Sequence, residues 1–157
     1  MPRPLPLTAS VDIDAPPAQV WEVVGDVTRM PEWSPELRRL RLVGRGPARV
    51  GSTLLGLNRR GWVAWPTSST IARLEPGRTV AWRTRESGAT WTYELAASAG
   101  GGTRLTGRRD LPAFSLGTTV LGPIIGGASG HDRELSEGLA TTLSRIRDAV
   151  EGSGPPH

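Results

Sequence analysis

The chain contains few of the side chains that enzymes use for covalent chemistry. It has no Cys, and all 19 of its Lys and Arg positions are Arg. Without Cys it has no disulfide, thiolate nucleophile or thiolate metal site, and without Lys it has no Schiff base and no lysine-containing phosphate loop. Of the two histidines, His157 belongs to a terminal stretch that we expect to be frayed. His131 therefore remains as a candidate general acid or base, because imidazole titrates near neutral pH.

His131 lies four residues before Leu135 and eight before Leu139, so it is expected on the apolar face of a helix. The alternative is an exposed or capping histidine at the helix start. The stretch “HDRE” (131–134) lacks a second His and a convergent carboxylate, so no metal site is predicted. Its carboxylates more simply complement the helix dipole.

Apolar periodicity predicts the elements that position these side chains. Alternation predicts a strand at 7–14, followed by a short helix that starts at Pro16 and Pro17. Apolar runs separated by turn signals predict an antiparallel meander with strands at 37–43, 51–58, 61–74, 78–85, 89–97 and 103–111. A final stripe predicts a long amphipathic helix near 131–150. Because a sheet with one apolar face needs a cover and only this helix is long enough, the fold class is α+β.

Several motifs on these elements resemble a known family. They are “VDIDAPPAQVWEVVGDVTRMPEWSPE”, “NRRGWVAW”, “LEPGRTVAWR”, “ATWTYEL”, “GGTRL” and “GLATTLSRIRDAV”. They make residues 7–150 similar to the START-like, or SRPBCC, superfamily, and in particular to its polyketide cyclase/dehydrase branch. The resemblance implies a helix-grip fold, in which a curved antiparallel sheet of about seven strands wraps around a long C-terminal helix, with two short helices after the first strand. We expect one domain at 1–152 and a disordered tail at 153–157.

The resemblance also implies an internal cavity for a hydrophobic small molecule, and strand alternation predicts which residues face it. The residues expected to contact a ligand are Trp33, Asn58, Trp65, Thr67, Ser69, Trp82 and Trp91. Trp82 and Trp91 could instead be ordinary core. Trp62 and Trp65 cannot both face inward in a regular strand, so one of them is expected on the outside or at an edge.

Trp33 stands in “RMPEWSPELRRL”, where Pro31 and Pro35 exclude a regular helix. In the family's fold the loop after the first helices closes one end of the cavity, facing the N-terminal part of the long helix. Trp33 is therefore expected to plug that end, in contact with both the core and the ligand space.

Arg109 and Tyr93 are the polar residues with the strongest predicted inward positions. Leu105 sets the inward phase of its strand, which places Arg109 inside and Arg108 outside, although a single bulge would exchange them. Glu36 is predicted to share an inward face with Leu40 and Leu42. Arg109 is then expected to form an ion pair with Glu36 or with Asp110, unless it contacts a ligand. A buried Tyr93 needs a hydrogen-bond partner, from the protein or from a ligand.

The main hypothesis is a binding protein for a hydrophobic or aromatic molecule, with possible polyketide cyclase, aromatase or dehydratase activity. On a poly-β-ketone, Arg109 and Tyr93 would stabilise an enolate or alkoxide, and Glu36 or His131 would move the proton. Such a lyase or isomerase needs no cofactor. The alternatives are a non-catalytic carrier or sensor for a lipid or metabolite, and a protein-interaction module that uses outward arginines.

The remaining expectations concern partners and location. The net charge is +4, but the arginines are spread along the chain among acidic residues, so no nucleic-acid partner is predicted. No apolar run reaches the length of a membrane span, so a cytoplasmic protein without integral membrane association is expected, either monomeric or homodimeric. The apolar, glycine-rich segment 114–130 is expected to form a mobile lid, a membrane contact or a dimer surface, or else a poorly ordered helix.

Overall fold

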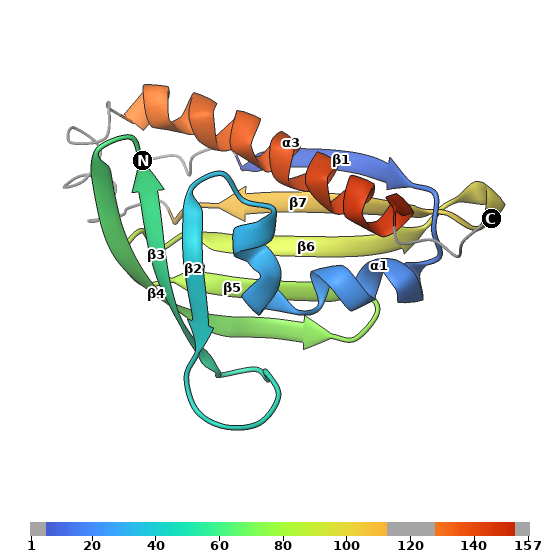
Figure 1. The fold of residues 1–157 in the computed structure, drawn as a ribbon, viewed down its shortest axis with the longest axis horizontal. Helices are drawn as coiled ribbons and strands as arrows, with labels where there is room; N and C mark the ends of the chain where they lie inside the picture. The colour runs from blue at the N-terminus through green and yellow to red at the C-terminus, as the bar shows by residue number, and fades with distance from the viewer. Residues whose placement is uncertain (1–5, 113–127, 153–157) are drawn as a thin grey trace.

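The computed structural model describes residues 6–112 and 128–152; in the second range, side chains are described for Arg133 and from Ser136 onward. These residues form one sheet covered by a long helix (Figure 1). The strands are β1 (Leu7–Ile13), β2 (Leu37–Leu42), β3 (Thr53–Arg60), β4 (Val63–Glu75), β5 (Thr79–Thr84), β6 (Thr90–Ala97) and β7 (Thr103–Asp110). The helices are α1 (Pro17–Val24) and α3 (Ala128–Gly152), with short 3-10 helices η1 (Val27–Glu32) and η2 (Ala99–Gly101).

The sheet has seven strands in the order β1-β7-β6-β5-β4-β3-β2, and every neighbouring pair is antiparallel. Strands β2 to β7 therefore form the predicted meander, and β1 pairs with the last strand. Helix α3 runs across one face of the sheet, which we call the inner face (Figure 1). The predicted helix-grip fold is confirmed, including the two short helices between β1 and β2.

Helix α3 covers the sheet with the apolar stripe that the sequence shows. Leu139, Leu143, Ile146 and Val150 are all buried in the core. The helix is longer than predicted, because it begins at Ala128 and ends at Gly152. Residues 128–130 of the predicted lid thus belong to α3, and the rest of that lid lies outside the described residues. No helix in the described ranges is long and apolar enough to cross a membrane.

Helix α1 starts as its prolines predict. Pro16 is the N-cap residue and Pro17 the first helical residue, where a missing N–H costs no hydrogen bond. The helix ends at Gly25, whose backbone N–H donates to the carbonyl of Trp21. Val20 and the other valines of the stripe point into the core.

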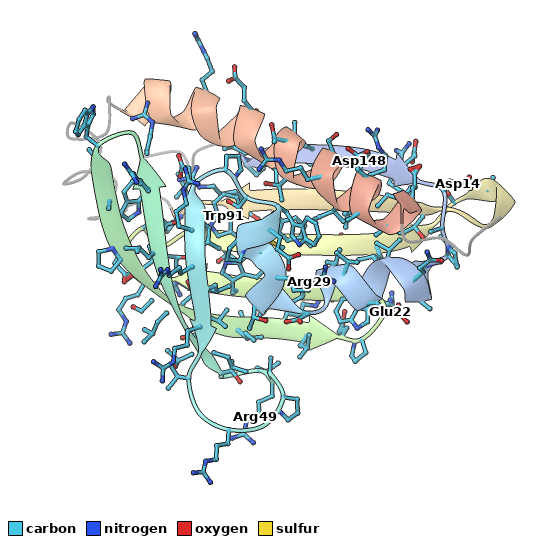
Figure 2. The ribbon with its side chains drawn as sticks, viewed as in Figure 1. Asp14, Glu22, Arg29, Arg49, Trp91 and Asp148 are labelled. Carbon is cyan, nitrogen blue, oxygen red and sulfur yellow. The ribbon has the colours of Figure 1, made fainter. Side chains whose placement is uncertain are left out.

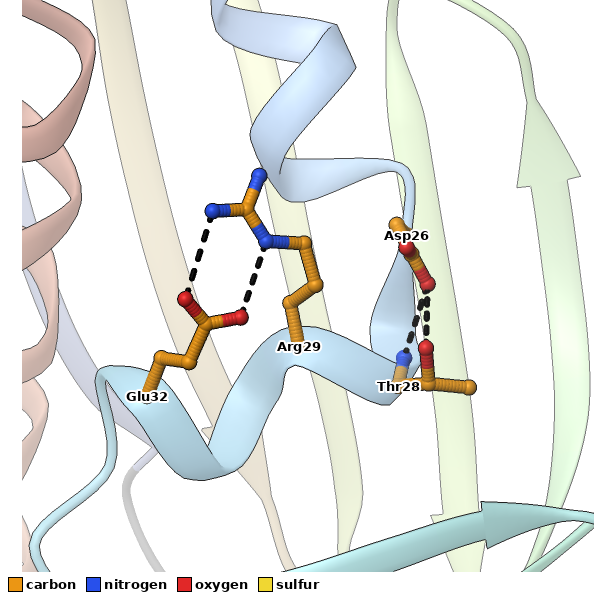
Figure 3. A network of polar contacts seen from close by, with 4 residues as sticks. All are labelled: Asp26, Thr28, Arg29 and Glu32. Carbon is orange, nitrogen blue, oxygen red and sulfur yellow. Dashed lines mark hydrogen bonds and ion pairs between the residues drawn. The ribbon is translucent and has the colours of Figure 1, made fainter.

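The segment before Trp33 differs from the expected open loop, because Val27–Glu32 forms a 3-10 helix with Pro31 inside it. Two local polar contacts hold this turn (Figure 3). The Asp26 carboxylate accepts hydrogen bonds from the Thr28 backbone N–H at 3.2 Å and from the Thr28 hydroxyl. The Arg29 guanidinium binds both oxygens of Glu32, at 2.9 and 3.3 Å. Trp33 is the C-cap residue of η1, so the geometry of this turn sets the position of the Trp33 backbone.

Candidate functional site

The strand register brings the predicted aromatic residues together on the inner face. Trp82 on β5 lies opposite Trp91 on β6, and Trp91 lies opposite Arg109 on β7. Tyr93, two residues further along β6, lies opposite Gly107. The Trp82 and Tyr93 rings are stacked, with centroids 5.6 Å apart and planes 17° apart. Figure 2 shows Trp91 in the interior of the molecule, whereas Glu22 and Arg49 lie at its periphery.

Arg109 points inward and is 7% exposed. The register of β7 with both neighbours is continuous from Thr103 to the end of the strand, so no bulge exchanges Arg109 with Arg108. The Arg109 guanidinium carbon lies 5.7 Å from the centroid of the Trp91 ring, a cation–π distance. Arg108 faces outward, and its guanidinium donates to the Asp110 carboxylate at 2.8 Å. Asp110, one of the two predicted partners of Arg109, is therefore bound by Arg108. Pairing of Arg109 with Glu36 stays a prediction.

The argument that placed Glu36 on the inner face is wrong. Strand β2 has a bulge between Leu37 and Arg39, which shifts the alternation by one residue. Leu37 therefore shares the inner face with Leu40, and the two side chains converge over Gly56. The alternation that linked Glu36 to Leu40 is broken, and Glu36 itself is half-buried just before the strand.

Tyr93 is buried, with 3% of its surface exposed. Burial raises the pKa of its hydroxyl, because a phenolate would lose its hydration. The hydroxyl forms no hydrogen bond with any residue in 6–112 or 128–152. A protein partner for this hydroxyl, one of the two options that the sequence left open, is thus not found in the described part of the chain.

Trp33 is buried between η1 and α3, with 7% of its surface exposed. Its carbonyl accepts from Arg145 Nη1 on α3 at 3.2 Å, and the Arg29 guanidinium carbon lies 5.1 Å from the ring centroid. Its indole Nε1 is buried and has no hydrogen-bond partner in the described part of the chain, an uncommon state for a buried donor. The predicted contact of Trp33 with the core is confirmed, and its contact with a ligand stays a prediction. Nothing in the sequence indicated the unpartnered nitrogen.

The predicted polar residues of the inner face bind one another. Asn58 Nδ2 donates to Thr67 Oγ1 at 3.1 Å, and the hydroxyls of Ser69 and Thr84 are 2.9 Å apart. Thr84 was not predicted as a site residue. These hydrogen bonds explain how polar groups are accommodated there, and a ligand-binding role for Asn58, Thr67 and Ser69 stays a prediction.

The two tryptophans of the β3–β4 hairpin do not both face inward, as expected. Trp65 is half-buried and lies opposite Asn58 on the inner face, whereas Trp62 is fully exposed in the turn. His131 falls within α3, and its side chain lies outside the described part of the structure. Within the described residues, no group of three His, Asp or Glu side chains is placed to hold a metal ion.

A hollow of about 240 Å³ opens elsewhere, at the ends of β5, β6 and β7. None of the residues predicted to contact a ligand lines it. Its lining residues are Arg83, Gly88, Thr90, Asp110, Leu111 and Pro112. Because the exposed Arg83 and the ion-paired Asp110 face outward, this hollow is separate from the aromatic inner face.

Comparison with known proteins agrees with this architecture. The profile of a family described as “Polyketide cyclase / dehydrase and lipid transport” matches residues 5–151. No curated protein sequence matches the chain.

Solved structures with a similar fold share little sequence identity with this chain. The KanY protein has a TM-score of 0.71 at 17% identity, with 97% of this chain and 100% of that chain covered. The Zhui aromatase/cyclase from a Streptomyces species has a TM-score of 0.64 at 17% identity, with 94% and 93% covered. The major latex-like protein 151 from Panax ginseng has a TM-score of 0.65 at 13% identity, with 92% and 96% covered. At these identities the likeness establishes the shared fold.

Proposed function

The chain belongs to the polyketide cyclase / dehydrase and lipid transport family of the START-like superfamily, and we propose that it binds an aromatic small molecule carrying hydrogen-bond acceptors between the inner face and α3. One observation carries the proposal: the indole Nε1 of Trp33 is buried and has no partner among the described residues. A buried donor without an acceptor costs free energy, which a ligand oxygen would recover.

A second donor supports the same site. The Tyr93 ring is buried in the same core cluster as Trp33, and its hydroxyl has no hydrogen bond within the described residues. This hydroxyl is not itself a fully buried unpartnered atom, which among the described residues is Trp33 Nε1 alone, so a ligand oxygen can reach it. Both residues lie close to residues of α3. Trp33 contacts Arg145, and the Tyr93 ring packs at Gly107 beside the position that Leu139 occupies. The buried Trp33 N–H and the Tyr93 hydroxyl, both in apolar surroundings, favour a flat ligand with carbonyl or phenol oxygens over a plain hydrocarbon chain.

The aromatic rings on the inner face supply the remaining complementarity. Trp82 and Trp91 are only partly buried, although they belong to the sheet face that α3 covers. Their uncovered ring surfaces can stack on a planar ligand, which adds to the free energy of binding beyond simple burial.

A cyclisation or dehydration step is the second candidate function, and the chemistry of Tyr93 and Arg109 favours it. Because burial raises the Tyr93 pKa, the hydroxyl stays protonated and can donate to a developing oxyanion. Arg109 adds a buried positive charge on β7, two residues from Gly107, which lies opposite Tyr93. An enolate carbon of a poly-β-ketone would attack a carbonyl carbon of the same molecule. A carbon–carbon bond would form, and the carbonyl oxygen would take the electron pair and then a proton.

Binding can be tested with 9-fluorenone and fluorene, which have the same shape but differ by one carbonyl oxygen. Titration should quench tryptophan fluorescence, and fluorenone should bind about tenfold more tightly than fluorene, as one recovered hydrogen bond predicts. Tyr93→Phe and Trp33→Phe should each reduce this preference. Trp62→Phe is the matched control, because Trp62 is fully exposed. Equal affinities for the two probes in all these proteins would refute the role of the buried donors.

Turnover can be separated from binding with a synthetic linear poly-β-ketone thioester. Mass spectrometry should detect loss of one water for each dehydrated ring closure if the protein is a cyclase. A variant that still binds fluorenone but leaves the polyketone at its background rate would indicate a residue needed for chemistry. Tight fluorenone binding by the wild type without any acceleration would identify a carrier or sensor instead.

A further inference from the structure

The outer face of β3 and its neighbours carries apolar side chains that no described element covers. Leu55 and Leu57 on β3 are 47% and 42% exposed. Leu57 lies directly opposite Pro66 on β4, which is also exposed. These three side chains belong to the face that α3 does not cover, so neither the core nor the proposed ligand site uses them. Exposed apolar groups gathered on one face indicate an interaction surface.

Trp62 stands at the end of the same hairpin and is 100% exposed. The turn that presents it is ordered by a hydrogen bond from Arg59 Nε to the carbonyl of Gly61 at 3.0 Å. Gly61 has a positive φ of 59°, a conformation that glycine adopts without strain. Figure 1 shows this hairpin end at the side of the molecule where α3 begins and β7 ends. A large aromatic side chain is thus held in solvent at a projecting turn, where it contributes nothing to the described core.

Two arginines flank the leucines directly. Arg39 on β2 lies opposite Leu57, and Arg41 lies opposite Leu55. Both are exposed, and neither side chain forms an ion pair or hydrogen bond with a described residue. Three other outward arginines of the sheet have carboxylate partners: Arg73 with Glu75, Arg104 with Asp12 and Arg108 with Asp110, at 2.8 to 3.1 Å.

A carboxylate that reaches this side of the sheet, Glu86, is already engaged. It accepts from the backbone N–H of Ser68 at 2.6 Å and from the Ser68 hydroxyl at 2.8 Å. The positive charge of Arg39 and Arg41 is therefore left for an external anion.

We propose that this outer patch docks the protein on a lipid bilayer that contains anionic phospholipids. The outer patch consists of Arg39, Arg41, Leu55, Leu57, Trp62 and Pro66. Tryptophan prefers the boundary between headgroups and acyl chains, and arginine is attracted to lipid phosphates. Exposed leucines between the arginines add apolar area to the same contact. The inference is independent of the proposed ligand site, since no residue of the outer patch contacts the inner face.

The arrangement fits a membrane better than the other partners that a basic patch can take. A single-stranded nucleic acid needs several aromatic stacking surfaces along a basic groove, whereas Trp62 is the one outward aromatic among the described residues. An isolated tryptophan at a projecting turn, with arginines and leucines behind it, is suited to a flat interface that it can enter.

The test is sedimentation of the full chain with phosphatidylcholine vesicles, with and without about one third phosphatidylglycerol. Binding is expected only to the anionic vesicles, and it should weaken at high salt because the arginine term is screened. Trp62→Ala should lower the partition coefficient on the order of tenfold, from the lost apolar area. Arg39→Gln with Arg41→Gln should lower it about 25-fold, from about fivefold for each arginine.

The control variant is Arg133→Gln with Arg147→Gln, which removes the same charge from α3 on the other side of the sheet. It should retain binding within about twofold, because those charges would face away from the bilayer. A second readout uses Trp62→Phe and vesicles that carry a brominated lipid. The wild type should lose tryptophan fluorescence when it binds these vesicles. The Trp62→Phe variant should still sediment with the vesicles, but it should lose a smaller fraction of its tryptophan fluorescence.

Three results would overturn the proposal. The first is no binding to anionic vesicles at low salt. The second is an equal loss of binding in the α3 control, which would mean that net charge alone is responsible. The third is retention of binding by Trp62→Ala combined with a Trp62-dependent dimer in solution, which would show that a second copy of the chain covers the outer patch. All variants replace exposed side chains, so circular dichroism should show unchanged folding.

Discussion

Replacing Tyr93 with phenylalanine is expected to stabilise the free protein and to weaken its binding of fluorenone. The change removes one hydroxyl, carried by a buried ring, that has no hydrogen bond within the described residues. It keeps the ring that stacks on Trp82 at 5.6 Å and packs beside Gly107. The effect on stability therefore isolates the hydroxyl.

The magnitude follows from the cost of an unsatisfied polar group. That cost is about 1–3 kcal/mol for a fully buried group, and the Tyr93 hydroxyl is not one of the fully buried unpartnered atoms of the described residues, so the lower end is the appropriate value here. A gain of about 1 kcal/mol corresponds to a rise in melting temperature of about 2–4 °C for a chain of this size. A buried tyrosine with a protein partner would behave in the opposite way and would lose about 1 kcal/mol.

The alkaline side of the stability curve provides a second measurement on the same residue. Burial raises the Tyr93 pKa above its ordinary value of 10.0, so above that pH the unfolded chain releases a proton that the folded chain retains. Stability is therefore complete below pH 10 and falls by about 1.4 kcal/mol for each pH unit above it. The chain has one Tyr, so the absorbance of phenolate reports Tyr93 alone. In the wild type that absorbance should appear together with unfolding, and Tyr93→Phe should unfold at a higher pH.

Urea unfolding followed by circular dichroism measures the change in free energy, and tryptophan quenching measures the affinity for fluorenone. The expected pair of results is a higher midpoint with an unchanged slope, and an affinity about tenfold lower. A destabilisation of about 1 kcal/mol or more would mean that the hydroxyl has a partner in the protein, and the reasoning would be refuted. Phenolate absorbance that develops near pH 10 in the folded protein would contradict the burial of Tyr93.

Four other substitutions test the packing and the facing of β7. Gly107→Ala should lower the free energy of unfolding in urea by about 1–3 kcal/mol, because the new Cβ would lie 2.8 Å from Leu139 Cδ1. An unchanged urea midpoint would show that α3 shifts to accommodate the Cβ without loss of stability. Thr103→Val should cost about 1–2 kcal/mol by the same assay, since it removes a buried hydrogen bond of 2.7 Å to a loop carbonyl. Arg109→Leu should lower fluorenone affinity, while Arg108→Leu should change stability by less than about 0.5 kcal/mol and leave affinity unchanged. The reverse pattern in this last pair would disprove the inward role of Arg109.

The sequence alone determined the elements and the phase of most strands. Alternation is a property of the strand itself, so Leu105 was enough to place Arg109 inside and Arg108 outside. The same reasoning separated Trp65 from the exposed Trp62. The apolar stripe of α3 was equally visible, because helical periodicity needs no knowledge of what the helix covers.

Alternation failed where the pairing between strands decides the outcome. The bulge in β2 moved Leu37 to the inner face and removed the basis for placing Glu36 there. A bulge arises from the fit of one strand to its neighbour, and its trace in this strand is the pair of adjacent arginines that breaks the alternation between Leu37 and Leu40.

Only the tertiary structure decided which polar groups are satisfied. Asn58 and Thr67 come from different strands, as do Ser69 and Thr84, and their mutual hydrogen bonds depend on the register of the sheet. The unpartnered Nε1 of Trp33 is equally invisible in a sequence, which shows the donor but not its surroundings. Hydrogen bonds of this kind depend on distances between residues far apart in the chain, and packing sets those distances only after the sheet and α3 have come together.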